Sequence, residues 1–420
     1  MQIKSKENII NYFNNGIKKN PLIGVENEKF LFETKSNQRA NYNKVRLVLE
    51  LLKNKFNWEE IKEGENLIGL KSNGKSITLE PGNQIELAGD KLVNIHQVCF
   101  ESYSFQDQLE EVCKEIGLKT LSIGYDPFTN LKDVPDNPKQ RYKLMTTEMP
   151  KNGDLSLNMM YQTSGTQINL DYISEDDFIK KFKLISHLTP LSIAIFANSA
   201  IKENKPSGYL SYRARVWQST SRGGLPKIFL ENMDFEKYAD YVINMPLLFI
   251  FRDNKHISVS EKNFQDFMNG SIKELNNKLP FSRDLEIHLS TIFTEVRLKK
   301  YLEIRSLDAC EWDCHCAGPA FYTGLVYGKL NEAFDVIKKW KINEILNAYL
   351  DAPKKGLKTE ISGKSILYWS NIFLNLSKEG LLLRNQQNQK GKNETVFLKN
   401  IENILNKNKT KADQTLDSLH

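Results

Sequence analysis

Acidic and basic side chains alternate with apolar ones along residues 293–305. One face of this stretch would carry, at every second position, Glu295, Arg297, Lys299, Tyr301, Glu303 and Arg305. The opposite face is mostly apolar, and this period of two predicts a single strand with one polar face. Carboxylates suit a divalent cation and guanidiniums suit phosphate oxygens, so the polar face could hold a metal–nucleotide complex. A ladder of exposed cross-strand ion pairs would explain the same pattern.

Three further segments place polar side chains at the same spacing. They contribute Glu26 and Glu28 from a strand at 22–32, Glu80, Gln84 and Glu86 from residues 76–88, and Gln167 and Asn169 from a strand at 163–171. Carboxylates gathered in this way repel one another unless cations lie among them. We therefore expect a sheet whose polar face is a ligand floor, although solvent-facing acids at a sheet margin would explain any single pair.

Arginines from several segments could supply the positive charge that such a floor needs. Arg141 begins one polar segment, and Arg213 lies with Trp217 in a glycine- and serine-rich loop. Together with Arg297 and Arg305, they could neutralise a γ-phosphoryl group or a substrate carboxylate. Arginines of a surface loop also form simple ion pairs. The combination predicts a phosphoryl-transfer enzyme that uses Mg²⁺ and a nucleotide, and the spacing does not name the acceptor.

Two sequence patterns suggest other sites. Residues 69–76 match the P-loop pattern letter for letter. A P-loop must open a helix, whereas the Asn73-Gly74 pair predicts a hairpin turn between two strands, so we reject that interpretation. Cysteine and histidine recur along residues 310–316, but without a second pair nearby they do not predict a structural zinc site. His96 and Cys99, three apart on an expected helix, are better explained by packing.

The chain has 420 residues, of which 26% are charged and 40% hydrophobic, and a net charge of +6. This composition is typical of a globular protein, and the charge is too small for the length to indicate a nucleic-acid surface. The N-terminus lacks the apolar segment of a signal peptide, and no apolar run reaches the roughly 18 residues of a membrane span. Five cysteines predict no disulfide framework, and an odd count fits a reducing compartment. We therefore expect a cytoplasmic protein without nucleic-acid or membrane partners.

Helical periodicity alternates with these strands, which predicts an α+β fold. Helices are expected over residues 5–19, 43–55, 91–116 and 174–199, with a kink or restart at Pro190, and a buried strand over 245–251. From about residue 335 the pattern is helical, with a loop at 386–396 and a frayed end over the last dozen residues. We expect a catalytic core over 1–335 and a helical extension over 336–420 that packs on it.

Segments spread along nearly the whole chain resemble the plant and proteobacterial type of glutamate–cysteine ligase. They are residues 24–30, 79–87, 94–99, 141–145, 196–199, 208–213, 295–305 and 316–321, in the family's order and spacing. The resemblance implies a glutamine-synthetase-like antiparallel sheet that forms a funnel-shaped site, backed by helices. It also implies that ATP and Mg²⁺ activate the γ-carboxylate of L-glutamate as an acyl phosphate, which the amine of L-cysteine attacks. The product would be γ-glutamylcysteine, in the first step of glutathione synthesis.

The resemblance assigns roles to residues by position. The acids expected to bind metal are Glu26, Glu28, Glu80, Glu86 and Glu303. The resemblance implies Arg141 and Arg213 at the reacting groups; from the charge pattern of the strand itself we add Arg305 there and assign Arg297, Lys299 and Arg305 to the nucleotide. The resemblance places Tyr142 and Trp217 around the cysteine pocket and Phe251 near the acceptor, and the polar strand face adds Gln167 and Asn169 as substrate contacts. Acyl phosphate formation needs positioning and charge neutralisation more than a protein nucleophile, which agrees with this set.

The chain departs from the family pattern at several positions. Phe251 stands where the family tends to have a tyrosine near the acceptor, Thr294 replaces a proline and Arg215 replaces a histidine. The plant members have a redox disulfide, and this chain does not match both of its cysteines. The regulation by that disulfide is therefore not carried over. Two alternatives stay open: a γ-glutamyl ligase that uses a different amine, and a non-catalytic binding protein on the same scaffold. The protein is expected to be a monomer or a homodimer.

Overall fold

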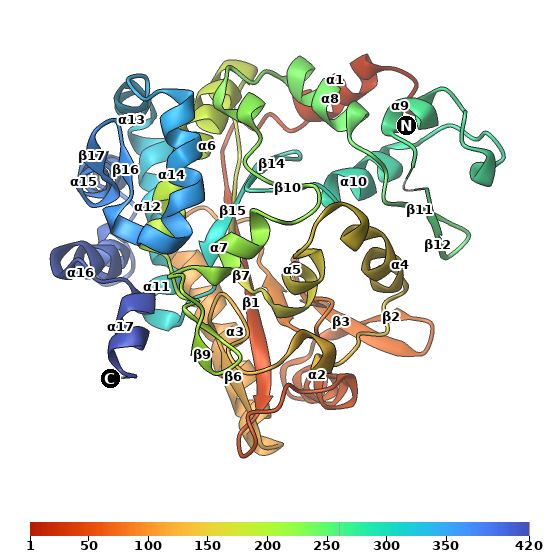
Figure 1. Cartoon of the computed structure of the whole chain (residues 1–420), viewed down its shortest axis with the longest axis horizontal. Coiled ribbons are helices and arrows are strands. Elements are labelled where there is room, and N and C mark those ends of the chain that lie inside the picture. The colour runs from red at the N-terminus through yellow and green to blue at the C-terminus, as the bar shows by residue number, and fades with distance from the viewer. Residues whose placement is uncertain (260, 420) are drawn as a thin grey trace.

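The computed structural model describes residues 1–259 and 261–419. The largest sheet in this part of the chain is antiparallel and has nine strands (Figure 1). Its strand order is β14-β15-β7-β1-β5-β4-β3-β2, and β6 pairs with the second half of β1. The strands are β1 (Ile23–Glu33), β2 (Glu59–Glu63), β3 (Asn66–Ser72), β4 (Lys75–Leu79), β5 (Ile85–Ala88), β6 (Leu118–Leu121), β7 (Gly165–Leu170), β14 (Val296–Leu298) and β15 (Leu302–Asp308). The antiparallel sheet and the mixture of helices and strands confirm the predicted α+β class.

Helices and short strand pairs surround the sheet. The helices are α1 (Lys6–Asn14), α2 (Tyr42–Phe56), α3 (Ile95–Glu115), α4 (Gln140–Glu148), α5 (Ser156–Gln162), α6 (Glu175–Ile195), α7 (Tyr212–Trp217), α8 (Phe235–Asn244), α9 (Phe264–Met268), α10 (Ser282–Ser290), α11 (Trp312–His315), α12 (Ala317–Thr323), the π-helical η5 (Gly324–Gly328), α13 (Leu330–Ile337), α14 (Ile342–Lys355), α15 (Ile366–Arg384), α16 (Lys399–Lys407) and α17 (Lys411–Asp417). The short strands are β8 (Ile201–Lys202), β9 (Lys205–Pro206), β10 (Gly223–Gly224), β11 (Phe249–Arg252), β12 (Lys255–Ser258), β13 (Phe293–Thr294), β16 (Glu360–Ile361) and β17 (Lys364–Ser365).

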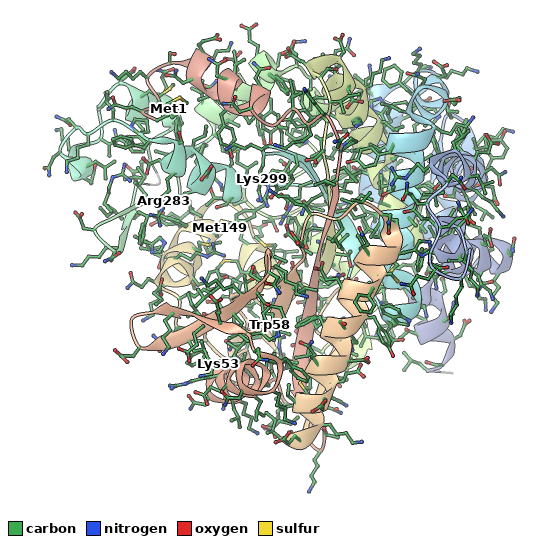
Figure 2. The ribbon with its side chains drawn as sticks, turned by 180° about the vertical axis from the view of Figure 1, so that it is seen from behind. Met1, Lys53, Trp58, Met149, Arg283 and Lys299 are labelled. Atoms are coloured by element: carbon green, nitrogen blue, oxygen red, sulfur yellow. A yellow bond between two sulfur atoms is a disulfide. The ribbon has the colours of Figure 1, made fainter. Side chains whose placement is uncertain are left out.

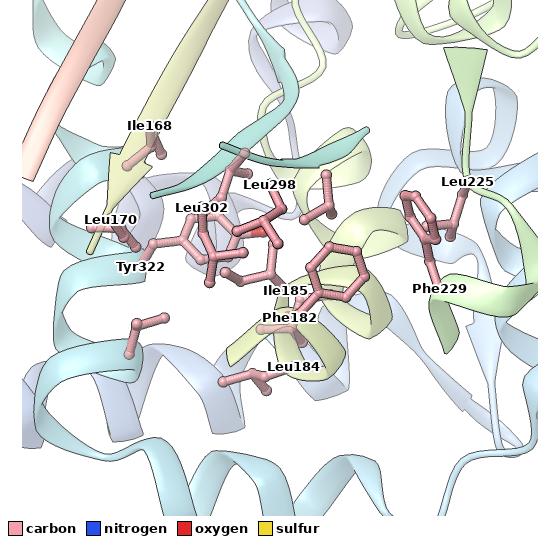
Figure 3. Packing of buried hydrophobic residues seen from close by; sticks show 14 of the residues in the cluster. Ile168, Leu170, Phe182, Leu184, Ile185, Leu225, Phe229, Leu298, Leu302 and Tyr322 are labelled. Atoms are coloured by element: carbon pink, nitrogen blue, oxygen red, sulfur yellow. The ribbon is translucent and has the colours of Figure 1, made fainter. Parts of the chain in front are cut away.

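The apolar face of the sheet is covered by helices in two groups. Around β7 and the β14–β15 hairpin, side chains such as Ile168 and Leu302 pack on Phe182 and Ile185 of α6 (Figure 3). Around β3, β4 and β5, the apolar side chains pack instead on α2 and α3, and the rear view shows α3 lying across this side of the sheet (Figure 2). Because successive strand residues point to opposite faces, the polar side chains are left on the face away from these helices.

The stretch 293–305 is a hairpin, so the prediction of one continuous strand is wrong. Residues 299–301 reverse the chain between β14 and β15, and Arg297 lies directly opposite Glu303. The two residues still share a face, because the reversal keeps their parity, and for this reason the period of two looked unbroken. Glu295 precedes β14, and its carboxylate accepts a hydrogen bond from Tyr349 at 2.9 Å.

Other predicted elements are confirmed or corrected in the same way. Residues 69–76 span the β3–β4 hairpin, with Asn73 and Gly74 both at positive φ, so the rejection of the P-loop is confirmed. The predicted loop that carries Arg213 is helix α7, which begins after Ser211 because that hydroxyl accepts a hydrogen bond from the backbone N–H of Ala214. The strand expected over 245–251 is reduced to β11.

The C-terminal region ends in helix α17 (Lys411–Asp417), in the segment where a frayed end was expected. In α17, the backbone N–H of Ala412 donates to the carbonyl of Ala197, and Ala412 is buried there. Helix α14 packs on α6, and α6 runs through Pro190 without a break. The division at residue 335 stays a prediction. Among the described residues, no helix is long and apolar enough to cross a membrane.

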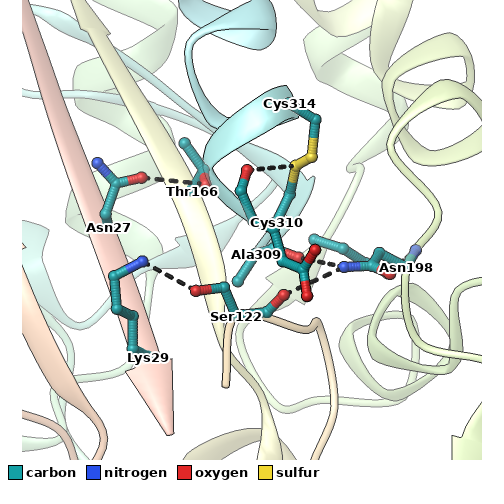
Figure 4. Close-up of a disulfide and its surroundings, with 10 residues drawn as sticks. Asn27, Lys29, Ser122, Thr166, Asn198, Ala309, Cys310 and Cys314 are labelled. Atoms are coloured by element: carbon teal, nitrogen blue, oxygen red, sulfur yellow. Dashed lines mark hydrogen bonds between the residues drawn. A yellow bond between two sulfur atoms is a disulfide. The ribbon is translucent and has the colours of Figure 1, made fainter. Parts of the chain in front are cut away.

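Cys310 and Cys314 form a disulfide at the start of α11, which the sequence analysis did not expect (Figure 4). Their Cα atoms are 5.9 Å apart. The spacing of four residues brings the two sulfur atoms together because the chain turns into a helix between them. Cys99, Cys113 and Cys316 are buried free thiols. Nearby, on the rear face of β1, the buried amine of Lys29 donates to the hydroxyl of Ser122 at 2.8 Å (Figure 4).

Candidate active site

The polar face of the sheet brings acids from distant segments into neighbouring rows. Glu28 on β1 lies directly opposite Glu86 on β5, and Glu26 lies opposite Gln167 on β7. Gln167 Nε2 donates to Glu28 Oε1 at 2.6 Å, and the backbone N–H of Gly165 donates to the other carboxylate oxygen at 2.8 Å. The antiparallel register therefore assembles a floor of carboxylates and amides.

Burial and mutual repulsion raise the pKa values of two carboxylates on this floor. Burial and then the charge of Glu80 raise the pKa of Glu28 to about 7, although Arg213 partly offsets them. Burial and then repulsion from Glu80, Glu26 and Glu28 raise the pKa of Glu86 well above its ordinary value. A cation among these carboxylates would relieve the repulsion and favour their charged forms.

Neutral oxygen atoms without partners lie among the same strands. The side-chain carbonyl oxygens of Gln84, Gln167 and Asn169 are buried and have no hydrogen-bond partner among the described residues. Mg²⁺ takes carboxylate and carbonyl oxygens, so the donor set fits a hard cation. Within the described part of the chain, no group of three or more His, Cys, Asp or Glu side chains is already arranged to hold a metal. The carboxylates would therefore have to turn from their present hydrogen bonds to converge on an ion.

Glu303 on β15 is fully buried among three cations. Arg297 donates to its two carboxylate oxygens at 2.6 and 2.8 Å, Lys299 lies 3.1 Å away, and Arg305 forms a further ion pair. Burial opposes the charge of Glu303, but the three cations outweigh burial and hold its pKa well below the ordinary value. This carboxylate is therefore ionised at neutral pH and balanced by protein cations.

Trp217 on α7 supports two guanidinium groups beside the floor. The guanidinium carbons of Arg213 and Arg305 lie 4.9 and 5.2 Å from the ring centroid of Trp217. Arg213 and Trp217 share a face of α7 because they are four residues apart. Arg213 is buried and its Nη2 donates to the carbonyl of Arg305 at 2.9 Å, whereas Nε and Nη1 have no hydrogen-bond partner among the described residues. Positive charge is thus concentrated at this side of the floor.

A cavity of about 70 Å³ opens beside the floor, which is smaller than a typical small-ligand site. The lining residues that the sequence analysis singled out are Glu28, Glu80, Gln84, Arg141, Tyr142, Trp217 and Arg305. Acids and arginines therefore line the same cavity. Tyr142 is held in the wall because its hydroxyl donates to the carbonyl of Leu79 at 2.7 Å.

Other predicted residues do not line this cavity. They are Glu26, Glu86, Gln167, Asn169, Arg297 and Glu303 on strands of the sheet, Lys299 in the turn after β14, and Arg213 on α7. The ring of Phe251 packs 4.9 Å from that of His256 and 5.1 Å from the guanidinium carbon of Arg283. Phe249, two residues earlier on β11, lines the cavity instead. The structure therefore does not bring Phe251 to the site as the sequence analysis expected.

The sequence analysis missed the apolar wall of the cavity. This wall is made by Met145, Met159, Met160, Phe249 and Phe293, from four separate segments. The adjacent pair Met159-Met160 was the available signal, since unbranched thioethers are common where a pocket must fit an irregular ligand. Lys139 was missed as well: burial lowers its pKa to about 8, and its amine donates to the carbonyl of Leu79 at 2.7 Å.

Comparison with solved structures supports the architecture. A glutamate–cysteine ligase from Francisella tularensis in complex with AMP aligns with a TM-score of 0.58 and 13% sequence identity. The alignment covers 96% of this chain and 85% of that chain. At this identity the similarity establishes the fold, and the predicted glutamine-synthetase-like sheet with helices behind it is confirmed.

Curated relatives match almost the whole chain. The chloroplastic glutamate–cysteine ligase of Solanum lycopersicum is 38% identical over 99% of this chain and 80% of its own length. Glutamate–cysteine ligase B, chloroplastic, of Oryza sativa subsp. japonica is 40% identical over 98% of this chain and 84% of its length. The expected cytoplasmic location is contradicted, because these relatives are named chloroplastic.

A family model matches the chain from residue 22 to residue 419, which includes every strand of the sheet. Its description is glutamate–cysteine ligase family 2. The acids of β1, β5 and β15 and the arginines of α4, α7 and β15 all fall inside the matched range. The resemblance seen in the sequence motifs is therefore confirmed, and the chain belongs to glutamate–cysteine ligase family 2.

Proposed function

We propose that the protein joins the γ-carboxylate of L-glutamate to the amine of L-cysteine at the expense of ATP. The γ-carboxylate oxygen attacks the γ-phosphorus of ATP, which releases ADP and forms γ-glutamyl phosphate. The cysteine nitrogen then attacks the acyl carbon, loses a proton and displaces phosphate. The product is γ-glutamylcysteine, in the first step of glutathione synthesis. The observation that carries this proposal is that acids of the carboxylate floor and two arginines line a single cavity.

The carboxylate floor would hold the magnesium ions. The proposed ligands are Glu26, Glu28, Glu80, Glu86 and Glu303. When bound, Mg²⁺ would neutralise charge on the phosphates of ATP. The raised pKa values of Glu28 and Glu86 support this assignment for β1 and β5, because carboxylates that repel one another gain most from a cation. Glu303 already has three cationic partners and would share them with an anionic ligand.

The arginines would stabilise the charge that moves between the γ-carboxylate and the phosphoryl group. Arg141 and Arg305 line the cavity, so their guanidiniums can reach the transferring phosphoryl and the glutamate carboxylates. Arg213 lies behind Arg305 and would add positive charge beneath the reacting groups. Arg297 and Lys299 would contribute to the nucleotide site indirectly, because both form ion pairs with Glu303.

The acceptor would contact the apolar wall of the cavity. Tyr142, Trp217 and Phe249 stand there with the methionines of α4 and α5, and such a wall suits a small side chain with a thiol better than a charged one. Phe251 lies outside this wall, so its missing hydroxyl does not by itself favour another amine. Gln167 and Asn169, which face the floor, would contact the glutamate end of the substrate pair.

Turnover with an acceptor panel tests the proposal. The purified protein should release ADP from ATP when Mg²⁺, L-glutamate and L-cysteine are all present, and the peptide product should appear in equal amount by mass spectrometry. Replacing L-cysteine with glycine or a simple amine should lower kcat/KM strongly, whereas 2-aminobutyrate tests for a general small-side-chain site. Equal ADP release without any amine would contradict ligation. If the parent protein binds ATP and never consumes it, the non-catalytic alternative holds.

A further inference from the structure

Helix α14, from the C-terminal region, holds both ends of α7, which carries Arg213 and Trp217. The carbonyl of Pro353 accepts the backbone N–H groups of Leu210 and Ser211 at 2.8 and 3.0 Å, just before α7 begins. Helix α14 ends two residues after Pro353, so this carbonyl has no helical partner and is free to bind them. Figure 1 shows α14 beside α7.

The other end of α7 is held through a second free carbonyl of α14. Pro353 has no N–H group, so the carbonyl of Tyr349, four residues earlier, lacks its usual helical hydrogen bond. Gln218, the residue that follows α7, donates its Nε2 to that carbonyl at 2.5 Å. Two free carbonyls near the end of α14, those of Tyr349 and Pro353, thus attach the helix that bears the buried arginine.

The side chain of Tyr349 reaches further into the site. Its hydroxyl donates to Glu295 Oε1 at 2.9 Å, and both side chains are buried. The second carboxylate oxygen of Glu295 has no hydrogen-bond partner among the described residues, and neither do Nε and Nη1 of Arg213. Burial raises the pKa of Glu295, and the charge of Arg213 partly offsets that rise. Glu295 and Arg213 thus each keep unpartnered side-chain atoms, and both residues bond the backbone of Arg305, Glu295 through its carbonyl and Arg213 through Nη2.

We propose that Tyr349 is a positioning residue that holds the carboxylate of Glu295 away from the guanidinium of Arg213. Without the Tyr349 hydroxyl, Glu295 would turn and form an ion pair with Arg213, which would remove positive charge from beneath the floor. The backbone of Glu295 also matters, because its carbonyl accepts the N–H of Arg305 at 2.9 Å. This inference rests on the proposed ligation for its catalytic consequence, whereas its structural consequence is independent of it.

Crystal structures of the parent and of Tyr349→Phe test the structural step directly. In the variant, a carboxylate oxygen of Glu295 should lie within hydrogen-bond distance of Arg213 Nε or Nη1. Tyr172→Phe is a matched control, because its buried hydroxyl donates to the carbonyl of Phe13 at 2.6 Å and Tyr172 does not line the cavity. That control should leave Glu295 in place. A Tyr349→Phe structure in which Glu295 keeps its parent position overturns the inference.

A double-mutant cycle with Glu295→Gln tests the catalytic step. Tyr349→Phe should lower kcat for ligation about tenfold, equivalent to the coupling of roughly 1.4 kcal/mol expected for two groups in contact, and leave KM for L-cysteine within about twofold. In the Glu295→Gln background, Tyr349→Phe should lower kcat by less than about twofold, because the amide cannot neutralise Arg213. Equal losses in both backgrounds overturn the inference. A parent protein without ligase activity would instead refute the proposed function, and the crystal structures would still decide the position of Glu295.

Discussion

Replacing Glu303 by glutamine removes the anion that three buried cations share. Glu303→Gln keeps the size of the side chain but leaves Arg297, Lys299 and Arg305 facing one another without a carboxylate. At an effective dielectric constant of about 20, each charge pair at roughly 4 Å contributes about 4 kcal/mol, and the cost of burying Glu303 offsets part of the sum. Breaking a buried ion pair by removing one partner costs about 3–5 kcal/mol, which we expect as the loss in the free energy of unfolding.

Urea unfolding at pH 7 without ligands measures this loss, with Glu236→Gln as the control. Glu236 forms an ion pair with Lys6 at 2.9 Å, but its side chain is 70% exposed, so the control should change the free energy of unfolding by less than about 1 kcal/mol. A Glu303→Gln protein whose unfolding midpoint and slope match those of the parent would refute the reasoning. It would mean that the buried cations find other partners without the carboxylate.

The pH dependence of the same difference gives a second check. The pKa of Glu303 is depressed in the folded protein, so its stabilising effect is present above its ordinary pKa of 4.5 and is lost as pH falls through the lower folded value. The difference between parent and Glu303→Gln should therefore be constant from pH 8 to about pH 5 and shrink below that. A difference that grows on acidification would contradict the assigned ion pairs.

Three further predictions concern the floor and the cavity. Glu28 should titrate near pH 7 in carboxyl ¹³C NMR spectra recorded without metal, and a midpoint near pH 4.5 would contradict the repulsion within the floor. Because the folded state binds this proton more tightly than the unfolded state, the contribution of Glu28 to the free energy of unfolding should fall as pH rises from 4.5 to about 7. Trp217→Leu removes the ring beneath two guanidiniums and should lower kcat/KM for ligation about tenfold in the ADP-release assay, with parent-like kinetics as the contrary result. Phe249→Ala should raise KM for L-cysteine severalfold, whereas Phe251→Tyr should leave it unchanged; the opposite order would show that the acceptor binds against Phe251.

The polar face of the sheet could be predicted from the sequence because the strand repeat is local. Glu26 with Glu28, and Gln167 with Asn169, fall on one face of their strands at any register, since side chains alternate at every residue. The same rule gave a wrong prediction of one strand at residues 293–305. A turn of three residues keeps the alternation of the two flanking strands in phase, so the turn is hidden in the sequence pattern. The loop expected around Arg213 was wrong for a related reason: a helix of six residues is too short to show a helical period.

The sequence by itself determined which strands carry acids, that helices lie behind them and that the motifs belong to one family. Tertiary structure alone decided that Glu28 faces Glu86, that Glu303 is enclosed by three cations, that Phe249 and not Phe251 reaches the cavity, and that Tyr349 binds Glu295. The physical reason is that alternation and helical period depend on neighbours in the chain. Which buried charges meet depends instead on strand register and on how distant helices pack.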